Sequence, residues 1–121
     1  MKTGHATAFL LLLLVYFGCS QPAGPGEVAR EFFGHLQHGQ PERARELLSR
    51  DTRDELDHHF GGKRIIGFVI DDVRISEDGN SASAAWSTEI EPFGPGDNNE
   101  GGRLELGRDE NDHWLITGFG N

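Results

Sequence analysis

The hydrophobic residues follow a helical period in the first part of the chain and a period of two in the second part. From Val28 to Phe60 apolar residues recur every three or four positions, which is typical of amphipathic helices. From Lys63 onward apolar and polar residues alternate, which is typical of strands with one buried face. Helices followed by a run of strands favour an α+β domain, in which the helices pack on one face of an antiparallel sheet.

Three helices are predicted before this change. The first begins at Pro25, which suits the first turn of a helix, and stops at Gly39. The second begins at Pro41, and the third is predicted to be capped by Asp51 and to end at the glycine pair 61–62. The apolar residues that these helices turn inward are Val28, Ala29, Phe32, Phe33, Leu36, Ala44, Leu47, Leu48, Leu56 and Phe60.

About four antiparallel strands are predicted after the helices. The first carries Ile66, Phe68 and Ile70 on one face and then changes parity across Asp71–Asp72, which predicts a bulge or bend in the strand. The segments that follow are a turn at 77–80, a second strand at 82–90, a polar loop at 92–102, a third strand around Leu104 and Leu106, a turn at 109–112 and a last strand at 114–119.

An almost unbroken apolar run precedes these elements and extends from Ala6 to Phe17. Twelve helical residues span roughly 18 Å, which is less than the roughly 30 Å hydrocarbon core of a bilayer. The run therefore predicts a signal peptide rather than a transmembrane helix. It ends at Gly18-Cys19, and Cys19 is the only cysteine of the chain.

The stretch Val15-Tyr16-Phe17-Gly18-Cys19 resembles a lipobox, the site at which bacterial lipoproteins are acylated on cysteine and cleaved before it. The resemblance implies a signal peptide at 1–18, a lipidated Cys19 with a short linker at 19–26, and a domain at 27–121. It further implies a place in the cell envelope, on the periplasmic face of the outer membrane if the organism is Gram-negative, because Ser20 follows the cysteine. The alternative is an ordinary secretory signal, which would leave Cys19 as a free thiol or in an intermolecular disulfide.

The charge balance restricts the partners of the chain. Its formal net charge of −9 argues against nucleic acid, whose phosphates would repel it, and against electrostatic binding to anionic lipid. Membrane association is therefore predicted to depend on the lipid anchor, since acyl chains bind a bilayer without a basic patch.

Three segments resemble the nuclear transport factor 2-like superfamily, and in particular its small bacterial lipoproteins of unassigned function. Residues 25–36 (PGEVAREFFGHL) look like its first helix, residues 39–48 (GQPERARELL) like its short second helix, and residues 112–118 (DHWLITG) like its closing strand. The resemblance implies a cone in which three helices pack on a curved antiparallel sheet and whose open end can hold a small ligand. Because such folds include isomerases, dehydratases, binding domains and dimerisation modules, the fold does not determine the function.

The sequence contains no assembled catalytic set, and no catalytic residue is predicted. Steroid-isomerase-type members of the superfamily use a tyrosine as oxyanion donor, whereas Tyr16, the only tyrosine, lies in the predicted leader. The candidates for a general base are His58 and His59, next to carboxylates at Asp54, Glu55 and Asp57. The two rings are expected to diverge, since adjacent side chains of a helix do not face each other.

Metal and cofactor sites are not predicted. His35 and His38 lie three positions apart on the first helix and could ligate a divalent ion, but the favoured interpretation is a solvated helix face. The acidic stretches 97–100 and 109–112 lack the alternating pattern of a calcium loop, so they are interpreted as turns.

The leading hypothesis is a lipid-anchored envelope protein with a small non-enzymatic domain that binds a small apolar ligand or a protein partner. One alternative is an isomerase- or dehydratase-type enzyme that uses a His–carboxylate pair in the cone, and another is a structural module, with homodimerisation as a further possibility. Five residues are candidates to line a ligand pocket, although the simpler interpretation places them in the core: Phe33, Leu56, Phe60, Trp86 and Trp114.

Overall fold

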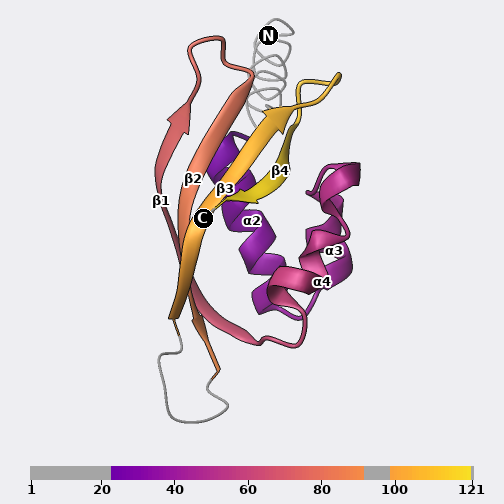
Figure 1. Cartoon of the computed structure of the whole chain (residues 1–121), viewed down its shortest axis with the longest axis vertical. Helices are drawn as coiled ribbons and strands as arrows, with labels where there is room; N and C mark the ends of the chain where they lie inside the picture. The colour runs from indigo at the N-terminus through magenta and orange to yellow at the C-terminus, as the bar shows by residue number, and fades with distance from the viewer. Residues whose placement is uncertain (1–22, 92–98, 121) are drawn as a thin grey trace, which may run out of the picture.

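The computed structural model describes residues 23–91 and 99–120, and this part of the chain is an α+β domain (Figure 1). The strands form one antiparallel sheet in the order β1-β2-β3-β4, so the predicted class and sheet are confirmed. The elements in chain order are α2 (Pro25–Gln37), α3 (Pro41–Glu46), the 3-10 helix η1 (Arg50–Thr52), α4 (Glu55–Phe60), β1 (Ile65–Ile75), β2 (Ser81–Ile90), β3 (Asn99–Arg108) and β4 (Trp114–Gly120).

Helix α2 lies against the sheet, which curves around it (Figure 1). Pro25 occupies its first turn, where the missing N–H costs nothing, and Gly39 just beyond its end has a φ of 70°, a conformation that glycine adopts without strain. The buried face of α2 contacts β1, β2 and β4 as well as α3. Its buried residues are Pro25, Val28, Ala29, Phe32 and Phe33.

The direction of α2 defines two ends of the domain. Its first turn lies at the end of β1, because a Cβ placed on Gly26 would be 3.2 Å from Cγ2 of Val73. Its last residue, Gln37, donates a 3.0 Å hydrogen bond to the carbonyl of Ile66, near the start of β1. We call the first end the turn end: it holds the start of α2, the β1–β2 turn and the β3–β4 turn, which are joined by the hydrogen bond from Arg108 N to the Asn80 carbonyl.

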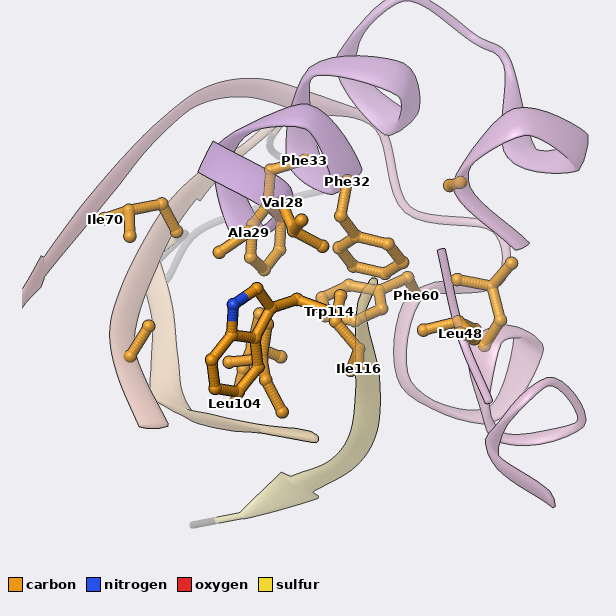
Figure 2. Close-up of a cluster of buried hydrophobic side chains, with 14 of the residues drawn as sticks. Val28, Ala29, Phe32, Phe33, Leu48, Phe60, Ile70, Leu104, Trp114 and Ile116 are labelled. Atoms are coloured by element: carbon orange, nitrogen blue, oxygen red, sulfur yellow. The ribbon is translucent and has the colours of Figure 1, made fainter. Parts of the chain in front are cut away.

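A single apolar core lies between the helices and the sheet (Figure 2). Phe32 and Phe33 are fully buried and meet edge to face at 5.1 Å, and Phe60 packs on both rings at 5.9 and 5.6 Å. Burying each such side chain contributes about 1.5–3 kcal/mol. The other large side chains with almost no exposure are Leu48, Leu56, Leu104, Leu106 and Ile116.

Strand β1 contains two irregularities, of which one was predicted. The register shifts between Asp71 and Arg74, and Asp72 has a φ of 46°, so the expected bulge is confirmed. A second shift between Ile65 and Gly67 was not foreseen. It reverses the parity of the strand start, so that Ile65 is buried and Ile66 is 44% exposed, and the predicted inward position of Ile66 is wrong.

Two boundaries differ from the predictions because contacts distant in sequence override local preference. Asp51 does not cap the third helix, since it lies in η1 and α4 begins only at Glu55. The backbone N–H of Ser49, the residue before η1, donates a 2.8 Å hydrogen bond to the carbonyl of Ile116, which ties this segment to β4. Strand β3 begins at Asn99, within the predicted polar loop, because these polar residues pair with the end of β2.

Candidate functional site

A pocket of about 340 Å³ opens at the end of the sheet opposite the turn end. Four elements and one connection converge on it: α4 supplies two histidines, the segment before β1 supplies a lysine, and β2, β3 and β4 supply the floor and one wall. We call this end of the domain the pocket end. The lining residues are His58, His59, Lys63, Trp86, Glu100, Gly101, Phe119 and Gly120.

The floor of the pocket is aromatic and continuous with the core. The ring of Phe119 lies 4.8 Å from that of His59 and 5.6 Å from that of Phe60. Trp86 contacts Phe33 at 5.3 Å and Phe60 at 5.5 Å. Both Trp86 and Phe119 remain only partly buried. The packing below therefore holds a partly exposed aromatic surface in place, to which a planar or apolar group can bind.

The rim of the pocket is polar. The rings of His58 and His59 lie 5.3 Å apart in an edge-to-face arrangement. The expectation that they diverge is therefore wrong, since both rings belong to the last turn of α4 and line the same pocket. The Lys63 ammonium pairs with both oxygens of Glu100, at 2.8 and 2.9 Å, across the mouth.

Gly102 in β3 leaves room for the indole ring of Trp86. A Cβ on Gly102 would lie 3.3 Å from the Nε1 and Cζ2 atoms of Trp86 and 3.0 Å from the carbonyl of Gly120. Among the described residues the buried Nε1 of Trp86 has no hydrogen-bond acceptor. An unpaired buried donor costs about 1–3 kcal/mol, so an acceptor brought beside this indole would be stabilising.

The predicted pocket residues occupy three different environments. Trp86 lines the pocket at the pocket end. Leu56 and Phe60 contribute to a second, smaller hollow of about 230 Å³ between α4 and the loop after α2. Phe33 and Trp114 belong to the packed core.

Phe119 was not foreseen as a pocket residue because of a register shift in β4. Trp114 and Ile116 point to the core with the expected alternation. The pairing then shifts, since Leu106 pairs with Ile116 and Glu105 with Gly118, and this brings Phe119 to the same face as Trp114 although its parity is opposite. Glu100 was not foreseen either, because the polar residues around it predicted a loop where the structure has the start of β3.

The carboxylates proposed as partners of the histidines lie elsewhere. Asp57 pairs with Arg45 at 3.5 Å, and Asp54 and Glu55 are exposed. The carboxylate that shares the pocket is Glu100, and it pairs with Lys63.

The histidines of α2 each have a partner on their own helix. His35 lies 3.6 Å from the Glu31 carboxylate, and His38 Nδ1 lies 2.7 Å from the Gly34 carbonyl. Over residues 23–91 and 99–120, no group of three or more His, Cys, Asp or Glu side chains is placed to hold a metal ion. Cys19 and the segment 1–18 lie outside the described residues, and no helix of the described part is long and apolar enough to cross a membrane.

Solved structures with similar folds include two bacterial proteins. The solution structure of a SEC-C motif-containing protein from Rhodopseudomonas palustris matches with a TM-score of 0.65 and 13% identity, over 85% of this chain and 83% of that one. A protein from Campylobacter jejuni, named as an NTF2-like transpeptidase, matches with a TM-score of 0.51 and 14% identity, over 78% of this chain and 98% of that one. No protein-family model and no curated protein matches the sequence.

These likenesses concern the fold alone. The second structure supports the nuclear transport factor 2-like architecture that the sequence predicts. Because one fold of this kind carries unrelated activities, what this chain does has to be argued from its own pocket.

Proposed function

We propose that this protein is a lipid-anchored envelope protein whose domain binds a small ligand at the pocket end without transforming it. The observation that carries the proposal is the pocket of about 340 Å³ with its aromatic floor and polar rim. In pockets that bind small molecules, a few convergent polar groups fix the orientation of the ligand, and in this pocket polar groups make up the larger part of the lining. Here the floor is Trp86 and Phe119, and the rim is the histidine pair with Lys63 and Glu100.

The polar groups of the rim favour a ligand that accepts hydrogen bonds. An ammonium group only donates and each neutral imidazole offers one donor nitrogen beside one acceptor nitrogen, while the one carboxylate of the lining, Glu100, already accepts from Lys63. The ligand class that fits is a small planar or apolar molecule with a carboxylate or carbonyl group, whose apolar part packs on Phe119.

The arrangement of charges supports binding over catalysis. A general base of the His–carboxylate type needs the two groups within hydrogen-bond reach. The carboxylates of Asp57 and Glu100 each pair with a cation instead, Arg45 and Lys63. An isomerase- or dehydratase-type enzyme remains the competing function. It would require His58 or His59 to act on a ligand without a carboxylate partner on the protein.

The anchor is proposed from the sequence. The apolar run 6–17 ends at the only cysteine, and the net charge of −9 offers no electrostatic route to an anionic membrane. Intact mass spectrometry of the membrane fraction tests it. A mass that begins at Cys19 and includes acyl chains, lost in Cys19→Ala together with membrane association, is expected. An unmodified soluble protein in both forms would contradict the anchor.

Ligand binding is tested by NMR titration with benzoate and benzylamine as matched probes. Both carry the same ring, but only benzoate offers a carboxylate to the donors of the rim. We expect benzoate to shift the resonances of His58, His59 and the Trp86 indole N–H, and benzylamine to leave them in place. Phe119→Ala should abolish the benzoate shifts, whereas Leu115→Ala, in the same strand but at the turn end, should retain them. Equal shifts with both probes, or no shifts with either, would contradict the proposal that the ligand carries a carboxylate or carbonyl group.

Protein binding is a second candidate function, favoured by one observation. Strand β1 is an edge of the sheet and carries exposed apolar side chains at Ile66, Val69, Val73 and Ile75. Edge strands with such residues pair readily with other chains. Sedimentation of the purified protein at rising concentration tests the simplest form, a homodimer. A mass that stays at one chain throughout would exclude it.

A further inference from the structure

The start of α2 and the pocket lie at opposite ends of the domain. Gly26 packs on Val73 at the end of β1, while Lys63, just before the start of β1, lines the pocket. Eight residue steps of β1, from its start at Ile65 to Val73, lie between these two points, which is about 26 Å of extended strand. The histidines of α4 line the same pocket. Any tether that enters α2 is therefore attached to the end of the domain that is remote from the pocket.

The proposed lipid anchor is joined to α2 by a short segment. Six residue steps separate Cys19 from Pro25, and an extended chain spans at most about 3.6 Å per step. An acylated Cys19 at the membrane surface therefore keeps Pro25 within roughly 20 Å of it. The turn end is within easy reach of the bilayer, whereas Lys63 at the rim of the pocket is farther from Val73 than the tether is long.

Exposed apolar side chains lie at this tethered end. Val73 is 38% exposed and Ile75 is 55% exposed, although Ile75 pairs with Ala82, whose side chain packs against the core. Exposed aliphatic groups that are held beside a bilayer gain free energy by entering its interface. The turns next to them are acidic, with Glu77 and Asp78 in one turn and residues 109–112 in the other, so they are repelled by anionic lipid.

We propose that the anchored domain stands with Val73 and Ile75 on a zwitterionic membrane surface and with the pocket facing away from it. This inference rests on the proposed anchor at Cys19. Its consequence concerns the source of the ligand: a pocket directed away from the bilayer is filled from the aqueous compartment. The occupant is therefore a water-soluble molecule rather than a membrane lipid, in agreement with the polar rim of the pocket.

Depth-dependent quenching of a fluorescent label tests the orientation. Acylation of Cys19 leaves an introduced cysteine as the only free thiol, so the lipoprotein can be labelled at Glu77→Cys, in the turn end, or at Glu91→Cys, next to the start of β1. Both positions are exposed glutamates, which makes the variants matched in charge. In phosphatidylcholine vesicles that contain a nitroxide headgroup lipid, we expect several-fold stronger quenching of the label at position 77 than of the label at 91.

Two further arms examine the cause of the orientation. Ile75→Ser should reduce the difference between the two labels, whereas Val69→Ser should not, although Val69 is equally exposed at 57%. Adding phosphatidylglycerol should also reduce the difference, because the acidic turns would be repelled. Equal quenching of both labels in phosphatidylcholine, or stronger quenching at 91, overturns the orientation. If neither label is quenched, intact mass decides which claim failed: a mass without acyl chains removes the anchor and the orientation with it, and an acylated mass overturns the orientation alone.

Discussion

The sheet contains two tryptophans, one at the turn end and one in the lining of the pocket, and the two differ in what covers them. At the turn end Trp114 is 5% exposed, and the Arg108 guanidinium lies over its ring at 4.9 Å. At the pocket end Trp86 is only partly buried and lines an open hollow. Both rings belong to or pack against the same core. The same type of residue is therefore closed off where a turn covers the sheet and stays accessible where the pocket opens.

The turns explain how the turn end is closed. In the β3–β4 turn the Asp109 carboxylate accepts hydrogen bonds from the backbone N–H groups of His113 and Asn111, at 2.9 and 2.8 Å, which lower the pKa of its carboxyl group. In the β1–β2 turn Asp78 accepts from the Ser76 hydroxyl and from the N–H of Asn80, which lower its pKa in the same way. These aspartates satisfy backbone donors that tight turns leave unpaired.

The largest effect is expected for a fully buried residue beneath the pocket floor. Phe33 is fully buried and contacts Phe60 and Trp86, so it supports the pocket floor from below. Phe33→Ala should lower the free energy of unfolding by about 3–5 kcal/mol and should also remove benzoate binding. Denaturant unfolding and the NMR titration measure the two effects. Full binding in a destabilised variant would show that the floor does not depend on the core.

A smaller effect on stability is expected for the pocket floor itself. Phe119 is partly exposed, so Phe119→Ala should cost about 1–3 kcal/mol, less than a fully buried ring. It contacts His59 at 4.8 Å, and its loss should therefore abolish binding even though the domain stays folded. The same two measurements apply. A loss of stability as large as that of Phe33→Ala would show that Phe119 is a core residue and not only part of the pocket floor.

Two glycines of β3 have different surroundings at the two ends of the strand. At Gly102 a Cβ would lie 3.0 Å from a backbone carbonyl and 3.3 Å from Trp86, whereas at Gly107, near the turn end, the nearest atom is the flexible Thr117 side chain at 3.4 Å. Gly102→Ala should therefore cost about 1–2 kcal/mol by overpacking and shift the Trp86 indole resonance. Gly107→Ala serves as the control and should leave that resonance in place. Equal indole shifts in the two variants would contradict a specific fit between Gly102 and Trp86.

Most of the fold follows from the sequence, because hydrophobic period and turn residues are local signals. The change of period after Phe60 and the change of parity at Asp71–Asp72 predicted the order of elements and the bulge. The pocket was predicted less completely. Phe119 reaches it through a register shift near Thr117, which alters the parity of β4 without any local signal.

The ion pair across the pocket shows the same limit. Lys63 and Glu100 are separated by 37 positions and meet only because β3 begins within a polar segment. Whether a polar segment forms a strand depends on the strand that it pairs with, and the residues of the segment itself do not identify that partner. Trp86, in contrast, was predicted because it lies in a strand with regular alternation.

The smallest effect is expected at the bulge of β1, on the exposed side of the sheet. Hydrogen bonds from Arg74 and Arg103 lower the pKa of the Asp72 carboxyl below its usual value of 3.8. Because folding favours the ionised form, this carboxylate stabilises the domain above the unfolded pKa, and the contribution is lost as the pH falls through the lower pKa of the folded state.

Asp72→Asn isolates this contribution, since asparagine also tolerates the φ of 46° at this position. The variant should unfold at a lower temperature than the wild type at pH 7, and the two melting temperatures should converge as the pH falls below 3.8. Benzoate binding should be unchanged, because Asp72 lies outside the pocket. A melting difference that persists undiminished at acid pH would show that the side chain acts through the geometry of the bulge rather than through its charge.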